Sequence, residues 1–140
     1  MEIKVKKLVP EAVLPSYAHV DDAGMDLFCL EKVVLTPGQR AQMRTGIALE
    51  IPKGYVGLIW DKSGLAQKYG LKTLGGVVDS TYRGEIMVGV VNLDSKPYTF
   101  EAGHKIAQIL IQKIEKVNIV DVDELSVTAR GHHAFGSTGK

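Results

Sequence analysis

The segment from residue 75 to residue 85, GGVVDSTYRGE, brings a carboxylate and an aromatic ring together between glycines. Asp79 is ionised at neutral pH and could act as a general base toward a water held near an electrophile. Tyr82 could stack against a sugar ring. The pattern predicts a β-hairpin with open backbone N–H and C=O groups for a base edge. From these residues alone, an ordinary hairpin with an aspartate in its turn is the favoured alternative.

The last eleven residues, RGHHAFGSTGK, could form a flap over a nucleotide. Arg130 offers a forked cation for an anion. Phe135 offers a flat apolar face for a base or sugar. Gly136, Ser137 and Thr138 offer backbone N–H groups and hydroxyls that suit phosphate oxygens. A disordered, solubilising terminus is an equally weighted interpretation of this composition.

A third segment, DKSGLA at 61–66, predicts the start of a short helix. Ser63 could cap a helix over residues 64–69, and Gly70 could end it. Helix N-termini carry unsatisfied N–H groups that attract anions, and Lys62 would add a positive charge. The alternative is a capped surface helix with no ligand. The spacing of a P-loop is absent.

Two weaker segments place polar side chains at strand starts. AGMDL at 23–27 sets Asp26 among apolar residues, and GHKIAQ at 103–108 contributes a lysine and Gln108. Either segment alone is more often structural. Neither His132 with His133, nor His19 with its neighbouring aspartates, has the spacing of zinc ligands. The sequence therefore predicts no zinc site built by the protein.

The bulk properties fit one soluble domain. The chain has 140 residues, and its 17 basic and 16 acidic residues nearly cancel. This balance argues against a nucleic-acid partner, and no apolar run is long enough to span a membrane. Cys29 is the single cysteine, so no intramolecular disulfide is possible, and its apolar neighbours predict a buried structural thiol. A reducing, cytoplasmic location is expected.

Hydrophobic alternation with a period of two dominates the chain. Short apolar segments separated by turn residues predict an all-β sandwich or barrel with one short helix. Residues 105–119 could also form a helix, but their β-branched content favours a strand. The composition changes near residue 126. We therefore expect a β-domain over 1–125 and a glycine-rich tail over 126–140.

Five segments in series resemble the five motifs of the trimeric dUTPase family. In chain order they are AGMDL, DKSGLA, GGVVDSTYRGE, GHKIAQ and RGHHAFGSTG. The resemblance implies a jelly roll of the β-clip type and a homotrimer whose active sites form between subunits. It also implies hydrolysis of dUTP to dUMP and pyrophosphate with Mg²⁺, with the tail closing over a site. Such an activity keeps uracil out of DNA and supplies dUMP for dTMP synthesis.

The resemblance also implies roles for individual residues. Asp79 would activate the attacking water, Tyr82 would pack on deoxyribose and exclude a 2′-hydroxyl, and Asp26 would support the site through a water near the metal. The residues expected to recognise uracil are Val77, Val78, Glu85, Ile86 and Met87. The residues expected to hold phosphates are Lys62, Ser63, Gly64 and Gln108. The tail residues expected to bind the terminal phosphate or cover uracil are Arg130, Phe135, Gly136, Ser137 and Thr138.

No direct protein ligand to Mg²⁺ is expected, because this ion prefers phosphate oxygens and water. The chain departs from the family pattern at three positions: Lys62 replaces an arginine, and His133 and Ala134 replace glycines. Lysine keeps the charge but loses the bidentate fork. His133 suggests a pH dependence near the ordinary histidine pKa of about 6.5.

Three classes of alternative function remain. dCTP deaminase and a bifunctional deaminase–dUTPase share the fold, but they resemble this chain less at residues 75–85 or in the tail. A non-catalytic nucleotide-binding relative would bind dUTP without turning it over. A nucleic-acid-binding β-barrel is disfavoured by the balanced charge and the few aromatic residues.

Overall fold

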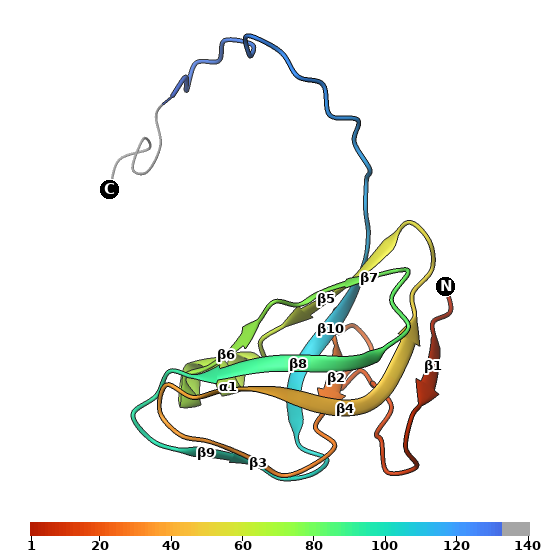
Figure 1. Cartoon of the computed structure of the whole chain (residues 1–140), viewed down its shortest axis with the longest axis vertical. Coiled ribbons are helices and arrows are strands. Elements are labelled where there is room, and N and C mark those ends of the chain that lie inside the picture. Colours follow the sequence, from red (N-terminus) through yellow and green to blue (C-terminus); the bar gives the residue numbers. More distant parts are fainter. Residues whose placement is uncertain (133–140) are drawn as a thin grey trace.

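The computed structural model describes residues 1–132, which fold into ten β-strands and one short helix (Figure 1). The elements are β1 (Lys4–Lys7), β2 (Met25–Phe28), β3 (Val33–Leu35), β4 (Arg40–Glu50), β5 (Tyr55–Trp60), α1 (Ser63–Tyr69), β6 (Leu71–Leu74), β7 (Val77–Asp79), β8 (Glu85–Asn92), β9 (Tyr98–Phe100) and β10 (Lys105–Lys113). The all-β jelly roll with one helix is confirmed. No helix within the described residues is long and apolar enough to cross a membrane.

Two four-stranded antiparallel sheets form the body. One has the strand order β1-β4-β8-β6 and the other β2-β10-β5-β7, while β3 and β9 form a separate pair. The core lies between the sheets, where buried side chains such as Met43 and Val88 from the first meet Leu27 and Ile109 from the second. β8 shows why the sequence forms strands, since every second residue of EIMVGVVN is buried.

Asn92 and Cys29 are buried polar groups that are fixed by the backbone. The Asn92 amide donates hydrogen bonds to the carbonyl oxygens of Leu35 and Lys96, at 2.9 and 2.8 Å. The Cys29 thiol donates to the Glu101 carbonyl oxygen at 2.9 Å, and burial raises the pKa of Cys29. A buried thiol held in its neutral form is a poor nucleophile, so the prediction of a structural cysteine is confirmed.

The predicted hairpin over residues 75–85 is wrong. β7 pairs with β5, whereas β8 pairs with β4 and β6, so the connection between them crosses from one sheet to the other. The turn itself is present, because Tyr82 N donates to the Asp79 carbonyl oxygen at 3.0 Å. The alternating pattern identified both strands but not their partners.

The short helix is confirmed, but its predicted cap is wrong. Ser63 is the first helical residue, and Lys62 occupies the N-cap position without a side-chain cap hydrogen bond. Gly70 ends the helix in the left-handed conformation, as the sequence predicted, and its N–H bonds to the Ala66 carbonyl oxygen.

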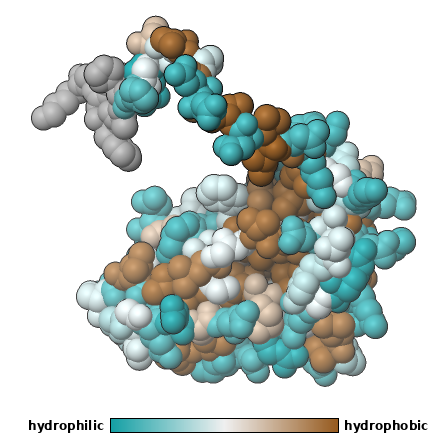
Figure 2. Space-filling model, turned by 45° about the horizontal axis from the view of Figure 1, so that its top comes forward, coloured by the Kyte–Doolittle hydropathy of each residue, from teal (hydrophilic) through white to brown (hydrophobic). Residues whose placement is uncertain are grey.

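Within residues 105–119 the predicted strand is confirmed only over Lys105–Lys113, which form β10, and no helix forms there. Ile114 N donates to the Gly54 carbonyl oxygen at 2.9 Å, and the chain then leaves the two sheets as an extended arm (Figure 1). Residues 115–132 are exposed, including Val117, Ile119 and Leu125, and apolar and polar side chains follow one another along the arm (Figure 2). The boundary between residues 125 and 126 lies inside this arm and stays a prediction.

Candidate functional site

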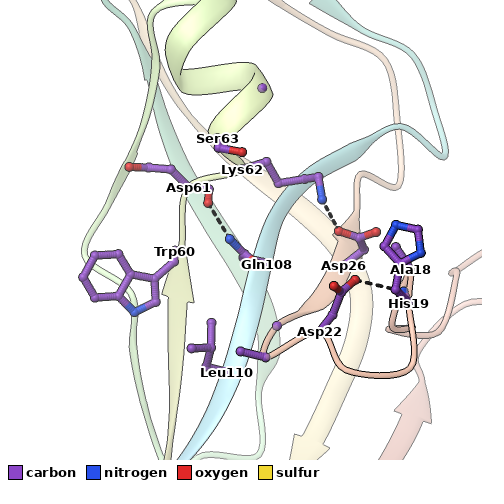
Figure 3. Close-up of a pocket in the computed structure, with 13 residues that line it drawn as sticks. Ala18, His19, Asp22, Asp26, Trp60, Asp61, Lys62, Ser63, Gln108 and Leu110 are labelled. Atoms are coloured by element: carbon purple, nitrogen blue, oxygen red, sulfur yellow. Dashed lines mark hydrogen bonds and ion pairs between the residues drawn. The ribbon is translucent and has the colours of Figure 1, made fainter.

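The four residues predicted to hold phosphates, together with the predicted supporting residue Asp26, line one cavity of about 560 Å³ (Figure 3). They come from β2, from the β5–α1 turn and the first residues of α1, and from β10: Asp26, Lys62, Ser63, Gly64 and Gln108. The loop of residues 18–24 and Trp60 complete the wall. Three segments far apart in the sequence thus meet because β10 pairs with both β2 and β5.

Asp26 is the buried charge of this cavity. Lys62 Nζ donates a hydrogen bond to one of its carboxylate oxygens, as drawn in Figure 3. Lys105 Nζ lies 2.6 Å from the other carboxylate oxygen. Burial alone would raise the pKa of Asp26. The hydrogen bonds and positive charges of Lys105 and Lys62 outweigh burial and hold this pKa below its ordinary value. The carboxylate is therefore ionised throughout the physiological pH range.

Gln108 is held in place by the backbone of the β5–α1 turn. Its amide nitrogen donates to the Asp61 carbonyl oxygen at 2.8 Å, a bond drawn in Figure 3. A side chain at Gly24 would overlap the Gln108 amide, so the absence of a Cβ at Gly24 makes this position available. The amide of Gln108 is thus fixed at the cavity wall, where it can contact a ligand.

Asp61 stabilises the turn that carries Lys62. Its carboxylate accepts bonds from the backbone N–H and hydroxyl of Thr73, both at 2.7 Å, and from Lys72 Nζ at 2.5 Å. Burial would raise the pKa of Asp61, but the bonds from Lys72 and Thr73 prevail and lower it. With all these bonds made, the role of the Asp61 side chain is structural.

A second cavity, of about 230 Å³, gathers the seven residues predicted between positions 77 and 87. They are Val77, Val78, Asp79, Tyr82, Glu85, Ile86 and Met87. Tyr82 is exposed, and its hydroxyl donates to the Glu85 carbonyl oxygen at 3.0 Å. Asp79 ends β7 and is also exposed, so its carboxylate is accessible to water.

The side chain of Glu85 points into the protein rather than toward a ligand. Its carboxylate accepts bonds from Arg44 Nε, at 3.2 Å, and from the backbone N–H of Gly46, at 2.8 Å. These contacts lie where the register of the β4–β8 ladder shifts, between Arg44 and Ala48. Only the backbone of Glu85 is therefore available to recognise a base.

The two cavities share no lining residue in the described part of the chain. β5 contributes Trp60 to the larger cavity and Ile59 to the smaller one. The fold thus assembles the predicted residues into two groups, not one. Arg130 lines neither cavity, and Phe135, Gly136, Ser137 and Thr138 lie outside the described residues.

Several residues at the cavities were not predicted from the sequence. Gln42 and Ile59 line the smaller cavity from strands that carry no polar motif, so no pattern indicates them. Lys105 belongs to the GHKIAQ segment, yet only the fold reveals its contact with Asp26. Adjacent residues on a strand point to opposite faces, which could have indicated that Trp60 and Ile59 serve different sites.

Residues 1–132 contain no group of three or more histidine, cysteine, aspartate or glutamate side chains arranged to hold a metal ion. Three carboxylates line the larger cavity, and each already accepts bonds. Asp22 accepts from His19 N at 2.9 Å, Asp61 from Thr73 and Lys72, and Asp26 faces two lysines. This set does not form a protein cage, but it suits an ion coordinated mainly by a ligand and water.

The fold and these cavities define an all-β jelly-roll protein with two cavities. One combines Lys62 and the start of α1 with three engaged carboxylates, and the other contains an exposed aspartate and an exposed tyrosine. The sequence model of dUTPase matches residues 10–139. The chain belongs to the dUTPase family.

Curated relatives cover nearly the whole chain. A deoxyuridine 5′-triphosphate nucleotidohydrolase from Thermobifida fusca is 48% identical over 142 residues, which span 99% of this chain and 79% of that protein. A protein of the same name from Clostridium tetani is 46% identical, with 99% and 97% covered.

Solved structures agree with the fold. The dUTPase of Staphylococcus bacteriophage 80alpha, determined with dUpNHpp, superposes with a TM-score of 0.93 at 32% identity, covering 99% of both chains. A mutant dUTPase from phage phi11, described with a coordinated structural Mg(II) ion, gives a TM-score of 0.83 at 29% identity, covering 89% of this chain and 98% of that one.

Proposed function

We propose that this chain is an enzyme that hydrolyses dUTP to dUMP and pyrophosphate. One observation carries the proposal. In a chain of the dUTPase family, the predicted phosphate-side residues line one cavity, and the predicted base, sugar and water-activating residues line another. The two groups have the complementary chemistry that a nucleoside triphosphate requires.

In the proposed mechanism, Asp79 orients and deprotonates the attacking water. Its exposure supports this role, because the carboxylate is open to solvent and can contact a water molecule. Tyr82 packs on deoxyribose and leaves no room for a 2′-hydroxyl. The bond from its hydroxyl to the Glu85 carbonyl oxygen fixes the side chain for this task. Backbone groups of residues 77–87 recognise the uracil edge.

The larger cavity holds the phosphates. Lys62 supplies positive charge, Ser63 and Gly64 supply backbone donors at the start of α1, and the fixed amide of Gln108 supplies a further donor. Donors already oriented toward developing negative charge lower the barrier, because they need no reorganisation during the reaction. Their shared role is to stabilise charge on the leaving pyrophosphate.

Mg²⁺ is the proposed cofactor. It would be bound by the triphosphate and water, with Asp26 accepting a hydrogen bond from one of those waters, and it would neutralise phosphate charge. The engaged carboxylates of the larger cavity fit this arrangement, since none is free to replace a phosphate ligand. The described side chains act by orienting the phosphates and holding Asp26 ionised.

A homotrimer with active sites shared between subunits is also proposed. The separation of the two cavities within one chain supports sharing, because the cavities of different subunits could then combine. The exposed apolar arm beyond Ile114 supports contact with another subunit. The tail, with Arg130 and Phe135, would close over the site and limit the entry of other water molecules. The single buried cysteine suits a cytoplasmic enzyme.

Pyrophosphate release from dUTP, dTTP, dCTP and UTP, each with and without Mg²⁺, tests the proposal. We expect Mg²⁺-dependent release from dUTP that far exceeds release from the other three. Ammonia should be measured in the dCTP reaction, because its formation would identify a deaminase of the same fold. Binding of dUTP without turnover would identify a non-catalytic relative.

A further inference from the structure

Asp26 is a buried carboxylate that is paired with two lysines. The Asp26 side chain is 4% exposed, whereas that of Lys62 is 28% exposed and that of Lys105 is 46% exposed. The two ammonium groups contact different oxygens of the same carboxylate. A buried carboxylate without a cation beside it strongly destabilises the fold. One lysine is enough to balance this charge, so the second lysine needs a separate explanation.

The position of Lys105 depends on an irregularity in the β2–β10 ladder. Gln108 pairs with Asp26 and Lys105 pairs with Phe28, while the register shifts between Lys105 and Ala107. Residues three apart on a regular strand face opposite sides. The extra residue reverses this alternation, so Lys105 and Gln108 both lie on the face of Asp26.

Only one of the two lysines lines the larger cavity. Lys62 does so together with Ser63 and Gln108, whereas Lys105 contacts Asp26 from outside the cavity lining. An anion that enters the cavity therefore meets Lys62 first. Attraction toward that anion weakens the contact between Lys62 and Asp26, and Asp26 then needs its second cation.

We propose that Lys105 is a positioning residue for substrate binding, which keeps Asp26 paired while Lys62 is drawn to the phosphates. The inference rests on the proposed function, since it assigns the triphosphate as the anion. Without Lys105, Asp26 would retain Lys62 and compete with the substrate for it. The loss should therefore appear in KM more than in kcat.

The variant Lys105→Met removes the charge and keeps the length of the side chain. We expect KM for dUTP to rise about tenfold, with a much smaller change in kcat. Lys32→Met is the matched control, because Lys32 pairs with Glu101 at 2.8 Å on the surface and lines neither cavity. Lys105→Arg should restore KM to near the wild-type value, since it restores the positive charge.

Asp26→Asn distinguishes this role from a merely structural one. With the competing carboxylate neutralised, adding Lys105→Met should change KM less than about twofold. An equal loss with and without Asp26→Asn would overturn the proposal, because Lys105 would then act independently of Asp26. If Lys105→Met does not fold, Asp26→Asn and the double variant still provide the comparison, and any marked difference between them contradicts it.

Calorimetry with inorganic triphosphate separates this inference from the proposed function. Wild-type protein that releases no pyrophosphate from dUTP would refute the function alone. The inference still requires triphosphate to bind the wild-type protein about tenfold more tightly than Lys105→Met. Equal dissociation constants, or no binding by the wild-type protein, would overturn it.

Discussion

Gly76 should tolerate no side chain, because the backbone of β5 occupies the space that a Cβ would need. A Cβ built on Gly76 lies 2.6 Å from the Ile59 carbonyl oxygen, well inside van der Waals contact. Gly76 has a φ of 112°, and its carbonyl oxygen accepts the N–H of Ile59 at 2.7 Å. The strained φ costs about 2 kcal/mol in Gly76→Ala. Loss of the hydrogen bond costs about 1 kcal/mol more.

Gly75→Ala is the matched control. Gly75 also has a positive φ, of 72°, but nothing lies within 4 Å of its Cβ position. We expect a cost of about 1 kcal/mol there, from backbone strain alone. Thermal unfolding, followed at one fixed protein concentration, measures these costs. Tm should fall by about 4 °C in Gly75→Ala and by about 12 °C in Gly76→Ala.

Activity gives a second measurement of the same prediction. Because Gly76 lines the smaller cavity beside Val77, a displaced β7 should raise KM for dUTP in Gly76→Ala more than in Gly75→Ala. Equal Tm and KM changes in the two variants would refute the reasoning, since the contact with Ile59 would then have no energetic consequence.

Four further predictions concern catalysis, the tail and pH. Asp79→Asn should lower kcat by about a hundredfold or more while dUTP still binds, and near wild-type turnover would remove Asp79 from its role. Deletion of residues 126–140 should abolish most activity but leave a folded trimer, as gel filtration and circular dichroism can check; loss of folding would make the tail structural. The pKa of Asp26 is lower in the folded protein than in the unfolded chain. The ionised carboxylate therefore stabilises the fold at any pH above its unfolded-state pKa of about 3.9, and this stabilisation is lost as the pH falls through the folded-state pKa. The stability difference between wild type and Asp26→Asn in urea should therefore be constant near neutral pH and shrink below about pH 4, and a pH-independent difference would contradict the assignment. His133→Gly should reduce the pH dependence of the rate near pH 6.5, whereas an unchanged profile would exclude His133 as its source.

Local chemistry in the sequence identified most of the elements. The alternation in β8 and the β-branched residues of β10 predicted strands, and Gly70 predicted the end of α1. These predictions hold because side-chain periodicity and the left-handed conformation are properties of a few neighbouring residues. The motif segments also supplied many of the residues that line the two cavities.

The sequence by itself therefore determined the fold class, the family resemblance and the set of candidate residues. Only the tertiary structure decided how these residues are grouped. Strand pairing joins positions far apart in the chain, so no local pattern could show that β7 and β8 belong to different sheets. The same reason applies to Asp26, whose two lysines lie 36 and 79 residues further along the chain and meet it only because β10 lies between β2 and β5.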